Sequence, residues 1–482
     1  MTKAGGGLDL HLELRLDPAQ AIGRALEQAL REAIRTGRLA AGARLPGTRS
    51  LAGDLGVARG TVVQAYSQLV AEGWLVGRPG AGTQVAAVTA APTNNPVARR
   101  VPGFAAPHGQ QLDSKGLEVL SLQAGRPDLS SFPREVWGRA VRRVLAGSAS
   151  ESFDYAPPEG LLVLRNAVAD YVSRARGVRA GAGDVVITAG YSHGLALLAR
   201  TFRELGMDRV SMENPGLARH RKLVAAAGLE VSPLSVDASG ADPDGVQGQV
   251  AVLTPAHQHP RGAVLAPERR MKFVEWAKDG FVVEDDYDGE FRYDQQPVGA
   301  MQALAPDRVI FAGCASKALA PGVRLGWLVV PPVLRKPLLQ AMTSTGSGVS
   351  AIEQLVMADL ITRGDYDRHI RKVRLEYRRR RTELAERVNT VWPHSLQGIA
   401  AGLHAMLPLE SAEEERRVID VAQYGGLSVH GLHTMGYWHT EDDSQPAALV
   451  LGYATPPPHA WRTALDRLTK VLQATNPARQ DG

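Results

Sequence analysis

The chain has 482 residues, of which 44% are hydrophobic and 22% are charged, as in a globular protein with two or three domains. No run approaches the roughly 18 apolar residues that cross a bilayer, and the N-terminal segment carries charges where a signal peptide needs an apolar core. We therefore expect a cytoplasmic protein without a membrane anchor. A single cysteine, Cys314, excludes an intramolecular disulfide and a multi-cysteine zinc site.

The net charge of +5 is concentrated in the first fifth of the chain. Residues 1–100 carry 12 Lys and Arg against 7 Asp and Glu, which leaves the rest of the chain near neutral. A local basic excess is a weak indication of a polyanionic partner, and a solvated surface explains it nearly as well.

The first 86 residues predict three helices followed by a hairpin. Asp17 and Pro18 suit the N-cap and first turn of a helix with apolar residues at helical spacing, ending near Gly37. Thr48 and Arg59 begin two short helical patterns. The segments WLVG and TQVA then flank the turn RPGAG, which predicts the hairpin.

Residues 87–115 are rich in Pro, Ala, Gly and polar residues and lack apolar periodicity, which predicts a flexible linker. Beyond the linker, apolar runs bounded by turn residues alternate with helical stretches. This alternation predicts an α/β domain over residues 116–482, with a mostly parallel sheet covered by helices on both faces. The apolar runs are DVVITAG, RVSMENPG, VAVLTPAH, GFVVEDD, RVIFAG and RLGWLVVPP.

Residues 10–86 resemble the winged helix-turn-helix of the GntR family of transcription regulators. The match follows AIRTGRLAAGARLPGTRSLAGDLGVARGTVVQAYSQLVAEGWLVGRPGAGTQV. The resemblance implies binding to double-stranded DNA, with the helix opened by ARGTV directed toward the major groove. Gly47 departs from the family, which usually has Ser after LP.

Within this resemblance, five residues are candidates for DNA contact. Arg59 and Thr61 would face base edges or phosphate, and Arg49 would hold a phosphate. Arg78 and the wing tip at Gly80 would reach the minor groove. Each arginine alone would suit a solvated helix residue as well, so the motif as a whole favours DNA contact.

The stretch GCASKALAPGVRLGW places Lys317 directly after an apolar strand, and Asp285 and Tyr287 follow another strand in the same way. Ligands of open α/β sheets lie beyond the carboxyl ends of strands. Pyridoxal 5′-phosphate needs an amine for a Schiff base, a carboxylate for its pyridine nitrogen, a donor for its phenolate oxygen and cations for its phosphate. Lys317, Asp285, Tyr287 and Arg324 suit this cofactor.

From about residue 116 to 475 the chain resembles the fold-type I, class I aminotransferases, and the whole chain resembles the MocR/GabR subfamily of regulators. The motifs YAPPEGLLVLRNAVADYVSRARGV, ITAGYSHGLALLARTF, MENPGLARHR, TPAHQHPRGAVL, EDDYDGEFRY and SKALAPGVRLGW occur in the family's order. The resemblance implies the pyridoxal-phosphate-dependent transferase fold, with a smaller C-terminal α+β subdomain. It also implies a homodimer, with a head-to-tail arrangement as one option.

Carried over by position, the resemblance implies a Schiff base on Lys317, a contact of Asp285 with the pyridinium nitrogen and a hydrogen bond from Tyr287 to the phenolate oxygen. Further residues would hold the phosphate or line the ring. These are Ser316, Arg324, Tyr191, Ser192, His257 and Gln258.

Three features have alternative interpretations. The run EDDYD with His257 and His259 could form a divalent-metal cluster, but the same residues fit the cofactor site in order, so we expect no metal. The run RKVRLEYRRRR, residues 371–381, has seven cations and one anion. A solvated helix face is favoured there over a second DNA contact. Cys314 stands where the family often has Ser and suits a buried small residue.

Four positions depart from the aminotransferase pattern. Leu217 replaces a common aromatic that stacks on the pyridine ring, His193 a Gln and Arg261 a Thr. Val450 stands where many aminotransferases have the arginine that pairs with the substrate carboxylate, a loss worth on the order of a few kcal/mol. Arg261 or another unmatched arginine could bind a carboxylate from a different direction.

We therefore expect a transcription regulator that senses pyridoxal 5′-phosphate, an amine or an amino acid through an aldimine on Lys317, with weak or no transaminase turnover. One alternative is an active aminotransferase with an accessory DNA-binding domain. Another is a regulator whose large domain no longer binds cofactor and serves only for dimerisation.

Overall fold

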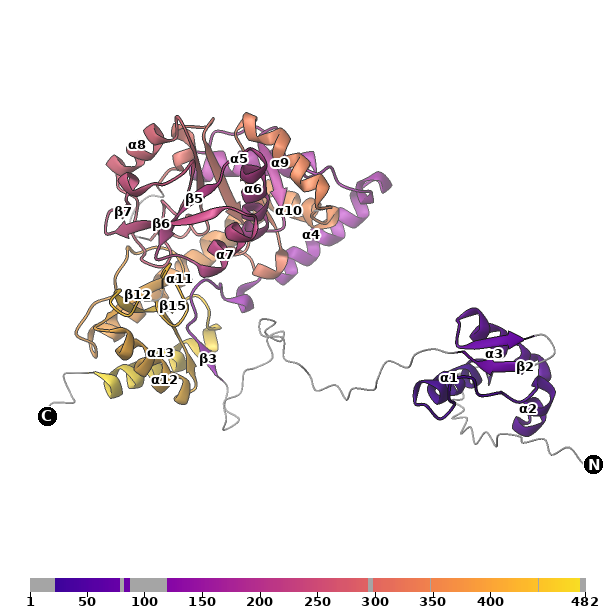
Figure 1. The fold of residues 1–482 in the computed structure, drawn as a ribbon. Coiled ribbons are helices and arrows are strands. Elements are labelled where there is room, and N and C mark those ends of the chain that lie inside the picture. The colour runs from indigo at the N-terminus through magenta and orange to yellow at the C-terminus, as the bar shows by residue number, and fades with distance from the viewer. Residues whose placement is uncertain are drawn as a thin grey trace, which may run out of the picture. The chain divides into compact units, whose positions relative to one another are not determined.

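The computed structural model describes residues 22–78, 82–86, 119–293, 298–346, 348–440 and 442–476. The chain divides into two compact units, Met1–Pro107 and His108–Gly482 (Figure 1). The predicted linker, residues 87–115, lies outside the described residues. Within the described ranges, no helix is long and apolar enough to cross a membrane.

The N-terminal unit contains three helices and a hairpin in the predicted order. They are α1 (Ile22–Arg35), α2 (Thr48–Leu55), α3 (Arg59–Ala71) and the antiparallel strands β1 (Leu75–Arg78) and β2 (Gly82–Val85). Gly56, with φ of 65°, ends α2 and turns the chain toward α3. The predicted cap at Asp17 and Pro18 lies outside the described residues. The three helices and the hairpin bury one core that includes Leu26, Leu30, Leu51, Val62, Leu69 and Val85.

An eight-stranded sheet forms the centre of the large unit. Its strands are β4 (Val185–Thr188), β5 (Arg209–Asn214), β6 (Glu230–Asp237), β7 (Gly240–Ala241), β8 (Val250–Leu253), β9 (Phe281–Asp285), β10 (Val309–Cys314) and β11 (Gly326–Val329). The order is β4–β11–β10–β9–β8–β5–β6–β7, and the strands from β10 to β6 are parallel. β11 is antiparallel to both neighbours, and β7 is antiparallel to β6. The prediction of a mostly parallel sheet is confirmed.

Helices cover both faces of this sheet because successive side chains of a strand point in opposite directions. These helices are α4 (Arg134–Gly147), α5 (Leu162–Arg176), α6 (Tyr191–Glu204), α7 (Ala218–Ala226), α8 (Pro267–Trp276), α9 (Pro332–Ser344) and α10 (Ala351–Thr362). Ile187 and Trp327 belong to a core shared with α5 and α10. Their neighbours Val186 and Leu328 belong to a core shared with α6 and α9. Strands buried on both faces explain the continuous apolar runs in the sequence.

The predicted smaller C-terminal subdomain follows the sheet. It contains α11 (Asp365–Asn389), β12 (His404–Leu409), α12 (Ala412–Tyr424), β13 (Leu427–Ser428), β14 (His430–Gly431), β15 (Ala447–Gly452) and α13 (Pro458–Thr475). β12, β15 and β14 form an antiparallel sheet. β3 (Leu120–Ser121) pairs in parallel with β13. The first described residues after the linker are therefore bound to this subdomain.

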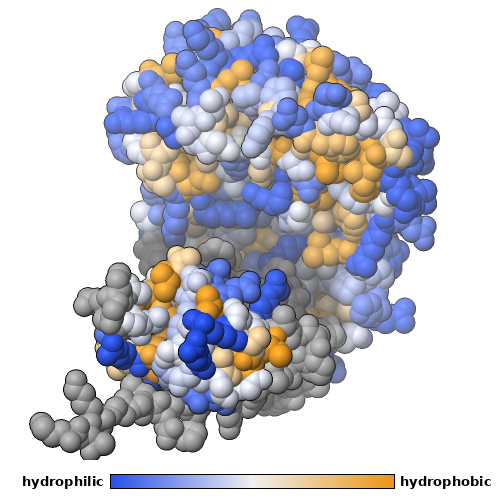
Figure 2. Space-filling model, turned by 90° about the vertical axis from the view of Figure 1, so that its right-hand side faces the viewer, coloured by the Kyte–Doolittle hydropathy of each residue, from blue (hydrophilic) through white to orange (hydrophobic). Residues whose placement is uncertain are grey.

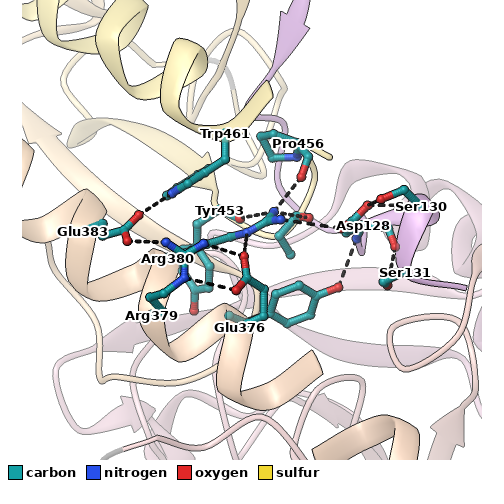
Figure 3. A network of polar contacts seen from close by, with 12 residues as sticks. Asp128, Ser130, Ser131, Glu376, Arg379, Arg380, Glu383, Tyr453, Pro456 and Trp461 are labelled. Atoms are coloured by element: carbon teal, nitrogen blue, oxygen red, sulfur yellow. Dashed lines mark hydrogen bonds and ion pairs between the residues drawn. The ribbon is translucent and has the colours of Figure 1, made fainter. Parts of the chain in front are cut away.

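Arg380 of α11 joins segments that lie far apart in the sequence (Figure 3). Its side chain is fully buried, with Nε 2.7 Å from Glu376 and Nη2 3.5 Å from Asp128. It also donates to the carbonyl of Pro456 at 2.6 Å and lies over the ring of Trp461 at 5.4 Å. The expectation of a solvated helix face at residues 371–381 is therefore wrong at Arg380. This arginine is buried because its contacts join α11 to other segments.

Candidate cofactor site and DNA-binding face

Lys317 lies on the turn directly after β10, at the carboxyl end of the parallel strands. Its Nζ donates a hydrogen bond to the carbonyl oxygen of Gly125. Burial lowers the pKa of the Lys317 ammonium, and the positive charge of Arg219 lowers it further. A lowered pKa increases the fraction of neutral amine, which is the nucleophilic form.

Asp285 is the last residue of β9 and pairs in register with Ala312 of β10. Its Oδ1 is buried without a hydrogen-bond partner. Burial raises the pKa of this carboxyl well above its ordinary value, and a hydrogen bond with Tyr191 and the positive charge of Lys317 lower it in part. A protonated ring nitrogen would supply a donor to Oδ1 and a further positive charge. The site therefore fits the pyridine ring of pyridoxal phosphate.

Groups suited to a phosphate meet at the amino end of α6. Tyr191 and Ser192 begin this 14-residue helix, whose free N–H groups and dipole favour an anion. The Nη1 of Arg324 lies 3.6 Å from the position that a Cβ on Gly190 would take. Arg324 has φ of 52° and is the one non-glycine residue in the described ranges with a left-handed backbone. Such conformations are characteristic of functional sites.

Tyr287 and Asp288 follow β9, and His257 follows the neighbouring strand β8. The Tyr287 hydroxyl lies 3.1 Å from Nδ1 of His257, and Oδ2 of Asp288 lies 2.9 Å from the same nitrogen. Burial raises the pKa of Tyr287 well above its ordinary value, and the Asp288 charge adds to the effect. The Tyr287 phenol therefore keeps its proton and can donate it in a hydrogen bond.

A buried ion pair fixes the loop after β9, and sequence reasoning missed it. Arg176 donates to both carboxylate oxygens of Asp286, at 2.6 and 2.9 Å. Both side chains are 2% exposed. Because Asp286 separates Asp285 from Tyr287, this pair holds both of its neighbours in place. The two partners are 110 positions apart, so no local pattern could have joined them.

Two predicted cofactor residues have polar groups that contact other parts of the protein. Gln258 is 1% exposed, and its amide donates to the carbonyls of Pro215 at 3.0 Å and His259 at 2.8 Å. The Ser316 hydroxyl lies 2.8 Å from the Cys314 sulfur. Gln258 therefore shapes the loop after β8, whereas Ser316 lies beside Lys317. Cys314 is buried, as the sequence predicted.

One cluster among the described residues has the composition of a metal site. His257, Asp288 and His404 are buried, with potential ligand atoms within 4.8 Å of one another. The sequence interpretation combined the acidic run with His257 and His259 and expected no metal. The structure instead brings in His404 from β12, while Nε2 of His259 lies 3.2 Å from the Tyr437 hydroxyl.

The surroundings of Val450 are apolar. Val450 is fully buried in β15, in a cluster with Met406 and Tyr437, and Leu217 packs against this cluster. Arg261, which could have replaced the missing arginine, donates instead to the carbonyl of Val236 at 2.5 Å. Among the described residues, the Val450 cluster itself contains no cationic side chain. The charge of Arg219 acts on it, because burial raises the pKa of Tyr437 and this charge lowers it in part.

The predicted phosphate and base contacts of the N-terminal unit lie at the starts of two helices. Arg49 is the second residue of α2 and Arg59 the first of α3, and both are exposed. Neither Gly47 nor Ala58, which precede these helices, makes a side-chain capping bond. The N–H groups at both helix starts therefore remain available to a phosphate.

The other predicted DNA contacts are described less fully. Thr61 is partly buried, and its Cγ2 lies 3.5 Å from the position of a Cβ on Gly23, so its methyl group packs toward α1. Arg78 ends β1, and its side chain lies outside the described residues. Gly80 lies outside them altogether.

Comparisons with known proteins define the class. Residues 22–85 match the family model of bacterial regulatory proteins of the gntR family, and residues 118–424 match that of aminotransferases of class I and II. GntR-type regulators bind DNA, and aminotransferases of this class depend on pyridoxal phosphate. The chain is therefore a GntR-type transcription regulator with an aminotransferase-like domain.

Relatives place it in the MocR-type subfamily, to which the chain belongs. It is 31% identical over 472 residues to the probable rhizopine catabolism regulatory protein MocR of Rhizobium meliloti, covering 94% of each chain. It is 32% identical over 437 residues to the pyridoxine biosynthesis regulator PdxR of Corynebacterium glutamicum, covering 89% of this chain and 92% of the relative. An archaeal alanine:glyoxylate aminotransferase structure is similar, with a TM-score of 0.68 and 25% identity over 75% of this chain and 92% of that chain.

Proposed function

We propose that this regulator binds pyridoxal 5′-phosphate at Lys317 and changes its DNA binding in response to the cofactor, or to an amine or amino acid that reacts with it. The observation that carries the proposal is the buried, unpartnered oxygen of Asp285 near the lysine amine. Burying a carboxyl oxygen without a partner is costly. A domain kept only for dimerisation has no need of this arrangement.

The bound cofactor would supply an aldehyde carbon that accepts an amine. Lys317 would provide that amine, Asp285 would hold the proton of the ring nitrogen, and Tyr287 would donate to the ring oxygen. The remaining predicted residues would surround the phosphate and the ring. They are Tyr191, Ser192, Ser316, Arg324, His257 and Gln258.

The hydrogen bond from Lys317 to Gly125 connects the cofactor site to the segment that follows the linker, and this connection supports a coupling of the site to the linker. Gly125 lies in the segment that follows the linker and carries β3. A lysine nitrogen engaged in an imine has fewer hydrogens to donate, so cofactor binding would weaken this bond. The response of this segment would then bias the DNA-binding state.

Exposed apolar side chains support the proposal of a homodimer. Figure 2 shows patches of apolar side chains on the face of the large unit where α4 lies. Tyr155 is 99% exposed, and large exposed apolar patches mark interfaces. Exposed large apolar residues between positions 129 and 163 are Leu129, Leu145, Phe153, Tyr155, Leu162 and Val163.

We also propose the domain boundaries 10–86 for the winged helix, 87–115 for the linker and 116–482 for the effector domain. The two family matches, at residues 22–85 and 118–424, are separated by the proposed linker and support these boundaries. A protein that acts on promoter DNA would work in the cytoplasm. Arg49, Arg59, Thr61, Arg78 and Gly80 would contact the DNA.

An active aminotransferase with an accessory DNA-binding domain is the second candidate, because Lys317 and Asp285 would also serve turnover. The apolar cluster around Val450 opposes it, since recognition of the substrate carboxylate would lose on the order of a few kcal/mol. Steady conversion of an amino acid and a keto acid by the purified protein would favour the enzyme.

Absorption spectroscopy of the full-length protein tests the proposal. Addition of pyridoxal 5′-phosphate should produce a visible band that is absent in Lys317→Ala. The band should remain in Lys278→Ala, a matched control, because Lys278 is exposed and pairs with Glu275. A wild-type protein without the band, or an unchanged band in Lys317→Ala, would contradict the proposal.

A further inference from the structure

We propose that Asp288 and His257 are positioning residues that keep the hydroxyl hydrogen of Tyr287 available for the ring oxygen of the bound cofactor. This inference rests on the proposed function and adds two residues to it. The structure places the three side chains in one chain of contacts, with Nδ1 of His257 in the middle.

The position of the hydrogen on His257 follows from the chemistry of its two neighbours. An ionised carboxylate only accepts hydrogen bonds, so Nδ1 of His257 must carry a hydrogen to bond Asp288 at 2.9 Å. A nitrogen that carries a hydrogen cannot accept one from Tyr287. The Tyr287 oxygen, 3.1 Å away, therefore shares the N–H as an acceptor. Its own hydrogen can point to Asp288, which also raises the pKa of this phenol through a hydrogen bond, or to the ring oxygen once the cofactor is bound. This polarisation also strengthens the phenol as a donor.

Without Asp288 the same contact would work against cofactor binding. A neutral imidazole can carry its hydrogen on Nε2 instead. The free electron pair on Nδ1 would then accept the hydrogen of Tyr287 and withdraw it from the cofactor. Asp288 thus selects the tautomer, as carboxylates do for histidines in metal and catalytic sites.

Tight packing from the C-terminal subdomain holds the side chains of Tyr287, His257 and Asp288 in place. His257 is 3% and Asp288 2% exposed. A Cβ on Gly402, whose φ is 70°, would lie 2.3 Å from Oδ2 of Asp288 and 2.4 Å from Nδ1 of His257. Only glycine leaves room there. Other titratable groups also face these three side chains. They are Asp285, Glu213, His259, Tyr293, His404, Tyr453 and Lys317.

The test is a pH titration of the visible band in the full-length protein loaded with pyridoxal 5′-phosphate. Its midpoint reports the proton shared by the lysine nitrogen and the ring oxygen. Because a donor to that oxygen weakens its hold on the proton, Tyr287→Phe should raise the midpoint, by about one pH unit. Asp288→Ala should raise it in the same direction. Loss of a nearby negative charge alone would lower it.

Two double variants separate positioning from direct electrostatics. Asp288→Ala should cause no rise in the Tyr287→Phe background, which has no hydroxyl to redirect. It should also cause no rise with His257→Phe, which keeps a ring and removes the competing nitrogen. Should Asp288→Ala unfold the protein, Asp288→Leu, which fills more of the volume, is expected to give the same rise. A fall or no change in the single variant, or an equal rise in all backgrounds, would overturn the inference.

Two further outcomes are distinguishable. A wild-type protein with no band would remove the proposed function, and the inference with it. A wild-type protein that shows the band, with variants whose titration midpoints do not shift as expected, would remove only the roles of Asp288 and His257. Elemental analysis of the purified protein is a separate test. One divalent metal per chain that is lost in His404→Ala would show that His257, Asp288 and His404 are metal ligands. This result would overturn the inference.

Discussion

Among single residues, Glu213 shows how burial sets chemical behaviour near the candidate site. It lies in β5, accepts a hydrogen bond from the Thr254 hydroxyl and lies 3.3 Å from the amide nitrogen of Gln258. Burial raises its pKa from 4.5 to about 7. The folded protein therefore holds this proton at a pH where the unfolded chain has lost it.

The pH dependence of stability follows from that shift. Below pH 4.5 the contribution of Glu213 to the free energy of unfolding is fully present, and it is lost as the pH rises through 7. The loss is roughly 3 kcal/mol. Glu213→Gln, which never ionises, should therefore gain stability relative to wild type between pH 5 and pH 8. Denaturant unfolding of the cofactor-free protein measures the difference.

Glu204→Gln is the matched control, because Glu204 is exposed on α6 and pairs with Arg200. Its stability relative to wild type should not change over the same pH range. If the Glu213→Gln and wild-type curves stayed parallel, Glu213 would be ionised in the folded protein, and the argument from burial would fail.

At the level of elements, the packing of α11 depends on Arg380, whose side chain is buried. Arg380→Met preserves much of the apolar volume but leaves the buried Asp128 without its cationic partner, whereas the partly exposed Glu376 keeps Arg379. Breaking a buried ion pair in this way costs about 3–5 kcal/mol. We expect the melting temperature of the large unit to fall accordingly in a thermal unfolding experiment.

The neighbouring Arg379 is the natural comparison. It is 51% exposed and pairs with Glu376 and Glu383 at the surface. Exposed pairs contribute about 0–1 kcal/mol, so Arg379→Met should be mild. Equal effects of the two substitutions would show that the buried network contributes no more than a surface pair.

The start of α3 carries the prediction for DNA binding. Arg59 is exposed at the first turn, where the free N–H groups also lie. Arg59→Ala should weaken binding to the DNA upstream of the protein's own gene at least about tenfold in a mobility-shift assay. Arg35→Ala, on an exposed arginine of α1 paired with Glu32, should bind as wild type does. Unchanged retardation by Arg59→Ala would count against α3 as the recognition helix.

For the molecule as a whole, the sequence predicted what local patterns encode. Apolar runs predicted the mostly parallel sheet, and Lys317 and Asp285 could be placed at one edge because Asp285 ends one strand and Lys317 lies on the turn after the next. Contacts between distant segments could not be predicted. Periodicity shows which face of an element is buried, but not that the carbonyl of Gly125, 192 positions away, accepts from Lys317, or that His404 packs beside His257.

The central claim is that a cofactor held at Lys317 changes how the N-terminal unit binds DNA. Fluorescence anisotropy of labelled upstream DNA, titrated with the full-length protein with and without saturating pyridoxal 5′-phosphate, tests it most directly. The account predicts that the cofactor changes the Kd at least about fivefold, and that Lys317→Ala removes this change. Identical Kd values with and without the cofactor, in a wild-type protein whose visible band proves that the cofactor is bound, would contradict it.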